Sequence, residues 1–486
     1  MYPPHLRHDV ESSTQIPPEL KEFCTQKTGG CLLIKGPAGS GKTTLALELL
    51  RLFATGGNGI YLSTRVNPMR MFIQFPWLKR IIESKHVLDT TQTYERREHA
   101  LEAFRIYDFR LREAPSFLET IYALACEISN RTTEEKHVRP FIVADSWDGT
   151  AKELEEKRDR LKIEKAFVAL VDKANATIIF VSEEPEQTTL DYLVDGVVEL
   201  CDDRVEDRRI REIYLRKLRG IKISQPIYLF TLQDGRFKCF GPHEVQTPTN
   251  SVKLEPIPDP DKDHISSGVR DFDEILGGGF LRGSVNILEF KQGGEIANRS
   301  LIFPLIVNHL NLGRPVVSVP FEGATAREYE VSMKQFLRDP ASWGRQVVSF
   351  ERGGGTEPYI KELGSTMEEQ FERYLEAAET KTQECGSPLL DLVGLDTMEH
   401  TYGASRVIEL LSQATLFYKT TGNVGLTVGI EGQEILEEVK HMAATYWRIE
   451  SRNRATVIYG VIPQTGLYAL EYTRENPINI RLTPVV

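Results

Sequence analysis

Short apolar runs alternate with longer amphipathic segments along the first half of the chain. The runs that predict buried strands lie at residues 31–34, 60–64, 141–145 and 177–181. Residues 45–53 place Leu45, Leu49 and Leu52 on one face of a helix, and residues 151–173 also have a helical pattern. Strands that alternate with helices in this way predict a parallel sheet with helices on both faces, which is an α/β fold.

The alternation of apolar strands and amphipathic helices is interrupted in two segments of the first half. Residues 194–200 and 209–219 predict strands, the second of them strongly basic, and residues 226–240 predict a hairpin. Residues 66–137 are charged and have a helical pattern. Acidic residues are interleaved in this segment, so we interpret it as solvated or interface-facing helices. Its arginine-rich face carries Arg96, Arg97, Arg105, Arg110 and Arg112.

The length of 486 residues predicts two or three domains. Residues 241–263 are rich in proline, threonine and aspartate and predict a linker, so we expect one domain at residues 1–240 and another at 264–486. The second domain repeats the order of the first: a strand at 285–290, a glycine-bearing loop, a helix, and a later apolar stretch that ends in Asp396. We therefore expect two tandem domains of one fold.

One loop of the first domain has the spacing G-x-x-x-x-G-K-[ST] and lies between a predicted strand and a predicted helix, as a phosphate-binding loop does. Its glycines allow backbone N–H groups to surround an anion, and the helix start adds unpaired donors and a positive dipole end. The lysine supplies a cation for the β- and γ-phosphates. A chance glycine turn is the alternative, and the flanking elements argue against it. The loop therefore predicts that ATP is bound by Gly36, Pro37, Ala38, Gly39, Ser40, Gly41, Lys42, Thr43 and Thr44.

A magnesium site is predicted beside this loop. The hydroxyl of Thr43 occupies the motif position that ligates Mg²⁺. The apolar strand at 141–145 ends in Asp145, as does a strand that carries a Walker B carboxylate. Many buried strands end in aspartate, so this assignment depends on the upstream loop and on the repeating strand–helix pattern.

Two further features bear on nucleotide chemistry. Lys217 and Arg219 fall on one face of the basic strand, where they repel each other unless an anion or acidic partner lies opposite. The alternative is a surface strand with salt bridges. In the second domain, the loop at 291–298 has no Gly-Lys-Ser/Thr triplet, and Glu295 would place an anion near any phosphate. We expect that loop to be degenerate and not to bind nucleotide.

The composition narrows the class of protein. Hydrophobic residues make up 41% and charged residues 27%, as in globular proteins, and no apolar run reaches the roughly 18 residues of a membrane span. The net charge of −11 argues against broad nucleic-acid binding. The six cysteines have no C-x-x-C spacing, and the first residues lack the apolar core of a signal peptide. We expect a cytoplasmic protein with reduced thiols and no membrane partner.

These elements together resemble the KaiC-type branch of RecA-like ATPases. The segments that carry the resemblance are residues 268–279 (GVRDFDEILGGG), 195–200 (DGVVEL) and 217–220 (KLRG). Two such domains in tandem are typical of that family. The start of the first domain, residues 61–66 (YLSTRV) and the degenerate second domain also resemble the gas-vesicle regulators of the GvpD type, which are KaiC-like repressor proteins.

The resemblance implies roles for particular residues. Lys217 and Arg219 would reach the γ-phosphate of a neighbouring subunit, in a homo-oligomer with nucleotide between protomers. Members of the family usually carry paired glutamates after the second strand, one of which activates water, and this chain has Thr64 and Arg65 there. We therefore expect slow ATP hydrolysis, unless another acid such as Asp148 substitutes.

The favoured function is a nucleotide-gated regulatory protein, in which ATP·Mg²⁺ in the first domain changes subunit packing or the affinity for a protein partner. The GvpD resemblance implies that this partner is a transcriptional activator of gas-vesicle formation and that the effect is repression. A RecA-like, DNA-stimulated ATPase is the alternative, although the acidic charge makes nucleic acid an unfavoured partner. A kinase is a third possibility, and the sequence offers no acid to position an acceptor.

Overall fold

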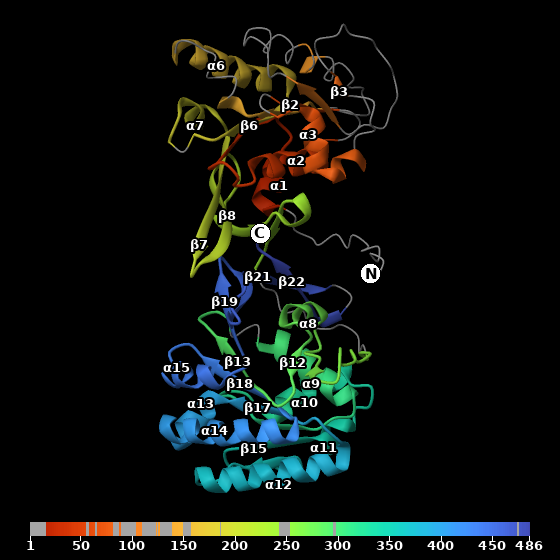
Figure 1. Cartoon of the computed structure of the whole chain (residues 1–486). Helices are drawn as coiled ribbons and strands as arrows, with labels where there is room; N and C mark the ends of the chain where they lie inside the picture. Colours follow the sequence, from red (N-terminus) through yellow and green to blue (C-terminus); the bar gives the residue numbers. More distant parts are fainter. Residues whose placement is uncertain are drawn as a thin grey trace. The chain divides into compact units, whose positions relative to one another are not determined.

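The computed structural model describes residues 16–54, 58–63, 66–80, 87–88, 104–108, 123, 125–126, 139–148, 157–184, 186–242, 253–294, 298–473 and 476–486. The chain divides into two compact units (Figure 1). Unit 1 comprises residues 1–241 together with Val485 and Val486, and unit 2 comprises residues 242–484.

Unit 1 is built on one mixed sheet, which has ten strands within the described residues. Its order is β10-β9-β8-β7-β1-β6-β5-β2-β4-β3, and the strands from β7 to β3 run parallel while β7 to β10 are antiparallel neighbours. The strands are β1 (Gly30–Lys35), β2 (Gly59–Ser63), β3 (Val87–Leu88), β4 (Phe104–Asp108), β5 (Phe141–Asp145), β6 (Thr177–Ser182), β7 (Gly196–Val205), β8 (Arg208–Leu218), β9 (Ile227–Thr231) and β10 (Lys238–Phe240).

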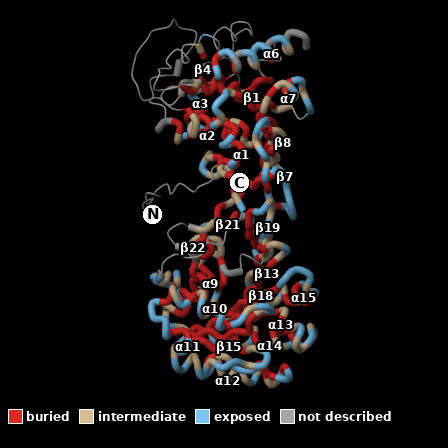
Figure 2. Tube along the Cα trace, turned by 180° about the vertical axis from the view of Figure 1, so that it is seen from behind, coloured by how far each residue is buried: buried red, intermediate tan, exposed pale blue. Residues whose placement is uncertain are grey.

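Helices cover both faces of this sheet because its central strands are apolar on both sides. On β1, Leu32 and Ile34 join the core beneath α1 (Pro18–Thr25), α2 (Lys42–Phe53) and α3 (Pro68–Gln74). The alternate residues Cys31 and Leu33 join the core beneath α6 (Lys157–Ala174) and α7 (Thr189–Leu193). Figure 2 shows β1 buried, while α6 and α7 expose their outer sides. The predicted α/β class is confirmed.

Unit 2 repeats the sheet of unit 1 position by position. Its order is β16-β15-β14-β17-β18-β13-β19-β20-β21-β22, again ten strands within the described part of the chain, with antiparallel pairing only from β19 to β22 among them. Strand β13 takes the place of β1, β17 that of β5, and β19 that of β7. The strands are β13 (Val285–Phe290), β14 (Val316–Val319), β15 (Val347–Glu351), β16 (Ile360–Glu362), β17 (Leu390–Gly394), β18 (Val424–Ile430), β19 (Thr445–Arg452), β20 (Ala455–Ile462), β21 (Tyr468–Thr473) and β22 (Asn476–Pro484).

The helices of unit 2 also form two layers. Leu288 and Phe290 of β13 pack in the core that includes α8 (Arg270–Leu276), α9 (Asn298–Asn311) and α10 (Ala326–Met333). Val285 and Ile287 pack in the opposite core, which includes α12 (Met367–Cys385), α14 (Ala404–Thr421) and α15 (Ile435–Val439). The remaining elements of this unit include β11 (His264–Ile265), β12 (Phe280–Leu281), α11 (Ser342–Gln346) and α13 (Leu395–Tyr402).

Two segments differ from what their sequences suggest. The helical prediction for 66–137 is wrong at β3 and β4, since Arg105 lies on β4 and pairs with Ile60 of β2; Arg96, Arg97, Arg110 and Arg112 lie outside the described residues. Residues 253–263, within the segment predicted as a linker, belong to unit 2. There Asp259 accepts hydrogen bonds from Arg282 at 3.0 Å and from Arg314 at 2.7 Å.

Candidate functional site

The loop between β1 and α2 curves tightly at its glycines. Gly36, Gly39 and Gly41 have φ of 150°, 80° and 101°, a region that residues with a Cβ rarely adopt. A Cβ on Gly36 would lie 2.4 Å from the carbonyl oxygen of Leu200 on β7, so the loop can pass this strand only with glycine there. The loop's crest is open, because Pro37, Ala38 and Gly39 are exposed.

Lys42 is the first residue of α2, and its ammonium folds back over the loop. Its Nζ donates to the carbonyl oxygens of Gly36 at 2.8 Å and Pro37 at 2.7 Å. The side chain is buried, and so is its neighbour Thr44. The cation therefore lies inside the curve of the loop, where a bound phosphate would replace the two carbonyls as its partner.

Thr43 and Asp145 are brought together, as the magnesium prediction requires. The Thr43 hydroxyl donates to Oδ2 of Asp145 at 2.6 Å, although the two residues lie 102 positions apart. The sheet explains the meeting: β6 separates β1 from β5, so the ends of β1 and β5 lie at one edge. Burial raises the pKa of Asp145, while the hydrogen bond from Thr43 and the charge of Lys42 oppose that shift.

A third residue at this carboxylate was missed by the sequence analysis. The hydroxyl of Tyr61, on β2, donates to the same Oδ2 of Asp145 at 2.5 Å, and the side chain is buried. Burial and the charge of Asp145 hold the pKa of this phenol well above its usual range. The apolar pattern of β2 marks Tyr61 as a core residue, and only the alignment of β2 beside β5 shows that its hydroxyl reaches the site.

These residues fit a magnesium-bound nucleotide chemically. The loop offers a glycine-lined cradle and a helix N-terminus for phosphate. Ser40 Oγ in the loop is fully buried and has no hydrogen-bond partner among the described residues. The Thr43 hydroxyl and the Asp145 carboxylate are oxygen donors of the kind that Mg²⁺ prefers. The assignment of the site residues to ATP and Mg²⁺ remains a prediction.

Lys217 and Arg219 both contact the segment at 191–195 of their own chain. Lys217 Nζ donates to the carbonyl oxygens of Asp191 at 3.2 Å and Val194 at 2.5 Å, and burial lowers its pKa. Arg219 lies one residue beyond β8 and pairs with Asp195 at 3.0 Å, with 59% of its side chain exposed. Their predicted role toward a neighbouring subunit remains a prediction.

Water activation would need a carboxylate near the nucleotide, and two places in unit 1 were considered for it. Thr64 and Arg65, at the place of the missing glutamates, lie outside the described residues. Asp148 is buried, and its carboxylate accepts from Ser182 Oγ at 3.0 Å and from the backbone N–H of Glu183 at 2.5 Å. Both oxygens of Asp148 are therefore engaged in fixing the end of β6.

The corresponding loop of unit 2 follows β13, and one of its backbone N–H groups meets a carboxylate from the same unit. The backbone N–H of Gln292 donates to Oε2 of Glu431 at 2.9 Å. Lys291 Nζ lies 3.9 Å from both Glu431 and Glu450. Glu295 lies outside the described residues, and Asp396 lies in the first turn of α13 rather than at the end of β17 as Asp145 does on β5.

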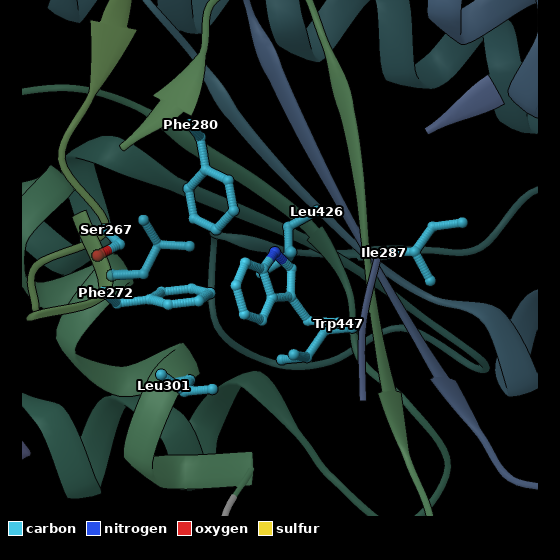
Figure 3. A pocket seen from close by; sticks show the side chains of 9 residues that line it. Ser267, Phe272, Phe280, Ile287, Leu301, Leu426 and Trp447 are labelled. Carbon is cyan, nitrogen blue, oxygen red and sulfur yellow. The ribbon is translucent and has the colours of Figure 1, made fainter. Parts of the chain in front are cut away.

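Unit 2 also contains an apolar pocket, which Figure 3 shows from close by. The side chains that line it include Phe272, Phe280, Leu301 and Trp447. They come from α8, β12, α9 and β19 and belong to the core beneath these elements. Apart from Ser267, the residues that line it are apolar, and none is a lysine or arginine, so this pocket does not resemble the loop of unit 1. Among the described residues, no helix combines the length and apolar character needed to cross a membrane.

The fold and the loop define the class: unit 1 is a P-loop domain of the RecA-like, KaiC-like type. Residues 20–219 match the family model described as "GvpD gas vesicle protein, P-loop domain". The whole chain is 27% identical to Protein GvpD2 and 26% identical to Protein GvpD1 of Halobacterium salinarum, covering 99% and 100% of those proteins. It is also 25% identical to the circadian clock oscillator protein KaiC of Thermostichus vulcanus, over 72% of this chain and 65% of KaiC. The chain is thus similar to KaiC-like P-loop proteins of the GvpD type, and the predicted resemblance is confirmed.

Proposed function

We propose that unit 1 binds ATP with Mg²⁺ and that its occupancy controls a protein partner in gas-vesicle formation. The observation that carries the proposal is the meeting of Thr43 and Asp145 at 2.6 Å beside the glycine cradle. The likeness to gas vesicle proteins of the GvpD type, which extends over the whole chain, supports the regulatory context.

The residues of unit 1 divide the work of holding the nucleotide. Backbone N–H groups of the loop and of the first turn of α2 surround the α- and β-phosphates. Lys42 moves its ammonium from the carbonyls of Gly36 and Pro37 to the β- and γ-phosphates. Thr43 and Asp145 hold the metal, and Tyr61 fixes the orientation of the carboxylate. A metal ion held by Thr43 and Asp145 would supply positive charge to neutralise the phosphates.

Unit 2 serves as a platform without nucleotide in this proposal. Glu431 already occupies a backbone donor of its loop, and the loop has no lysine at the position of Lys42. A triphosphate there would face the negative charge of Glu431, which Lys291 approaches to 3.9 Å, while Glu450 is paired with Arg452 at 2.7 Å.

The output is a change in assembly or in affinity for the partner, which we infer to be a transcriptional activator that is repressed. Arg219 suits a role toward a neighbouring subunit's γ-phosphate, since its guanidinium is held by a half-exposed ion pair with Asp195 and such pairs contribute little. Lys217 is bound to two carbonyls and would first have to leave them. Asp148 is engaged at the end of β6, which favours slow turnover and regulation by occupancy.

The test is photo-crosslinking of the full chain with azido-ATP, followed by proteolysis and mapping, with sizing of the same sample with and without ATP·Mg²⁺. We expect labelling of residues 36–44 and a change in assembly. Labelling confined to residues 242–484 would refute the proposal. Hydrolysis that rises on addition of single-stranded DNA would instead indicate a nucleic-acid enzyme.

A further inference from the structure

We infer that Arg211 is a positioning residue for the phosphate-binding loop, which it holds from behind so that the loop's N–H groups face the nucleotide. The inference rests on the proposed nucleotide site, but it concerns a residue on β8 that has no place in the loop motif. Its evidence is a set of hydrogen bonds between the Arg211 guanidinium and the backbone of the loop.

The Arg211 side chain contacts the phosphate-binding loop directly. Nη1 of Arg211 donates to the carbonyl oxygens of Gly39 and Ser40, each at 3.2 Å. The guanidinium is buried, with 4% of the residue exposed. Its contacts with these two carbonyls span 171 and 172 positions of sequence, so they depend on the sheet that places β8 near the loop.

The carbonyls of a phosphate-binding loop need such a donor. In a peptide unit, the C=O and the following N–H point in opposite directions, so N–H groups that face an anion leave carbonyls directed away from it. A carbonyl turned inward would repel the phosphate, and a buried one without a donor is costly. Arg211 satisfies two successive carbonyls at once, which favours the orientation that leaves the loop's donors free for phosphate.

Other contacts within unit 1 hold the guanidinium itself. Its Nε donates to the carbonyl oxygen of Val486 at 2.7 Å, and Nη1 lies 3.3 Å from Oδ2 of Asp202. Burial lowers the pKa of Arg211, and the charge of Asp202 opposes that shift. A fixed fork with several donors can serve both sets of partners, whereas a lysine at this position has a single ammonium.

The chain supplies a matched control two positions away. Arg209 lies on the same strand and binds the same carboxylate, at 2.9 and 2.7 Å from the two oxygens of Asp202. Its side chain is 52% exposed, and within the described part of the chain it makes no hydrogen bond or ion pair with residues 36–44. Arg209→Ala therefore removes a cation and a bond to Asp202 while the loop keeps its donor.

The experiment compares Arg211→Ala, Arg211→Lys and Arg209→Ala with the unaltered full chain by calorimetric titration with ATP and with ADP in Mg²⁺. The loop's N–H groups surround the α- and β-phosphates, which both nucleotides carry. We therefore expect Arg211→Ala to weaken ATP and ADP by a similar factor of about tenfold or more, as loss of charged hydrogen bonds predicts. Arg211→Lys should retain part of the affinity, and Arg209→Ala should bind as the unaltered chain does.

Hydrogen exchange of residues 36–44 without nucleotide provides a second measurement. We expect faster exchange there in Arg211→Lys than in Arg209→Ala, which tests the contact even if Arg211→Ala fails to fold. Affinity and exchange equal to those of Arg209→Ala, or a loss for ATP alone, would overturn the inference. If the unaltered chain binds neither nucleotide, the proposed function fails, and exchange still decides whether Arg211 holds the loop.

Discussion

Replacing Lys42 with methionine separates two effects of one side chain. The aliphatic stem is kept, while the ammonium that donates to Gly36 and Pro37 is lost. In the nucleotide-free protein, the buried carbonyl of Gly36 then has no charged donor, and a buried acceptor left without its partner costs about 1–3 kcal/mol. We therefore expect Lys42→Met to unfold somewhat more readily than the unaltered chain before any nucleotide is added.

The larger effect should appear with ATP·Mg²⁺. A ligand at about 100 times its Kd stabilises the folded state by about 2.7 kcal/mol. For a unit of this size, that corresponds to a rise in the unfolding temperature of about 5–10 °C. The variant lacks the cation for the β- and γ-phosphates, so we expect this rise to disappear.

The assay is scanning calorimetry of the full chain with and without ATP·Mg²⁺. Lys291→Met in the loop of unit 2 is the control, because it removes a lysine ammonium from the glycine-bearing loop that we expect not to bind nucleotide. The control should keep the full rise. If Lys42→Met keeps the rise in unfolding temperature and Lys291→Met loses it, the loop of unit 2 binds the nucleotide. The assignment of Lys42 would then be refuted.

Three further substitutions test separate parts of the structure. Tyr61→Phe removes a donor to Asp145, and we expect the Mg²⁺ concentration for half-maximal ATP binding to rise roughly tenfold; an unchanged Mg²⁺ titration would show that the phenol has no positioning role. Arg219→Ala breaks only an exposed pair, so the free energy of unfolding should change by less than about 0.5 kcal/mol, whereas ATP-dependent assembly measured by light scattering should fall. If assembly and turnover both persist, a role toward a neighbouring subunit is wrong. Asp391→Asn, in the core of unit 2, tests burial of a carboxyl whose pKa burial raises to about 7. Because the folded pKa exceeds the unfolded value of about 3.9, wild-type stability is full below about pH 4 and is lost as the pH rises through 7, by at most about 1.4 kcal/mol per pH unit. The variant, in which the hydroxyl of Tyr418 still finds an acceptor, should gain stability relative to the unaltered chain over that range in urea titrations; parallel curves would contradict the shift.

The sequence predicted the elements that carry strong local signals. Buried strands such as β1 and β5 are short continuous apolar runs, and the loop at 36–44 has a fixed spacing, so both could be recognised without tertiary information. The predicted hairpin at 226–240 corresponds to the antiparallel pair β9 and β10. The helical prediction for 66–137 failed at β4, where Arg105 is paired in the sheet and charge obscured the strand pattern.

Contacts that depend on the order of the strands in the sheet could not be predicted from the sequence. Tyr61 looks like any core tyrosine until β2 is placed beside β5, and Arg211 is one of several arginines on β8 until that strand is placed near the loop. Local pattern likewise gives no reason for Lys217 to turn toward the carbonyls at the end of α7. Such partners depend on pairing across more than 20 and up to 172 positions.

The bond between Gln292 and Glu431 has a consequence for anyone who wishes to revive the loop of unit 2. Grafting a lysine and a threonine into that segment would restore the letters of the motif, yet a resident carboxylate would still compete with the incoming phosphate. Nucleotide binding would require Glu431 to be neutralised in the same variant. We therefore expect no binding from the grafted lysine and threonine alone, or from the change at Glu431 alone, and binding only when they are combined.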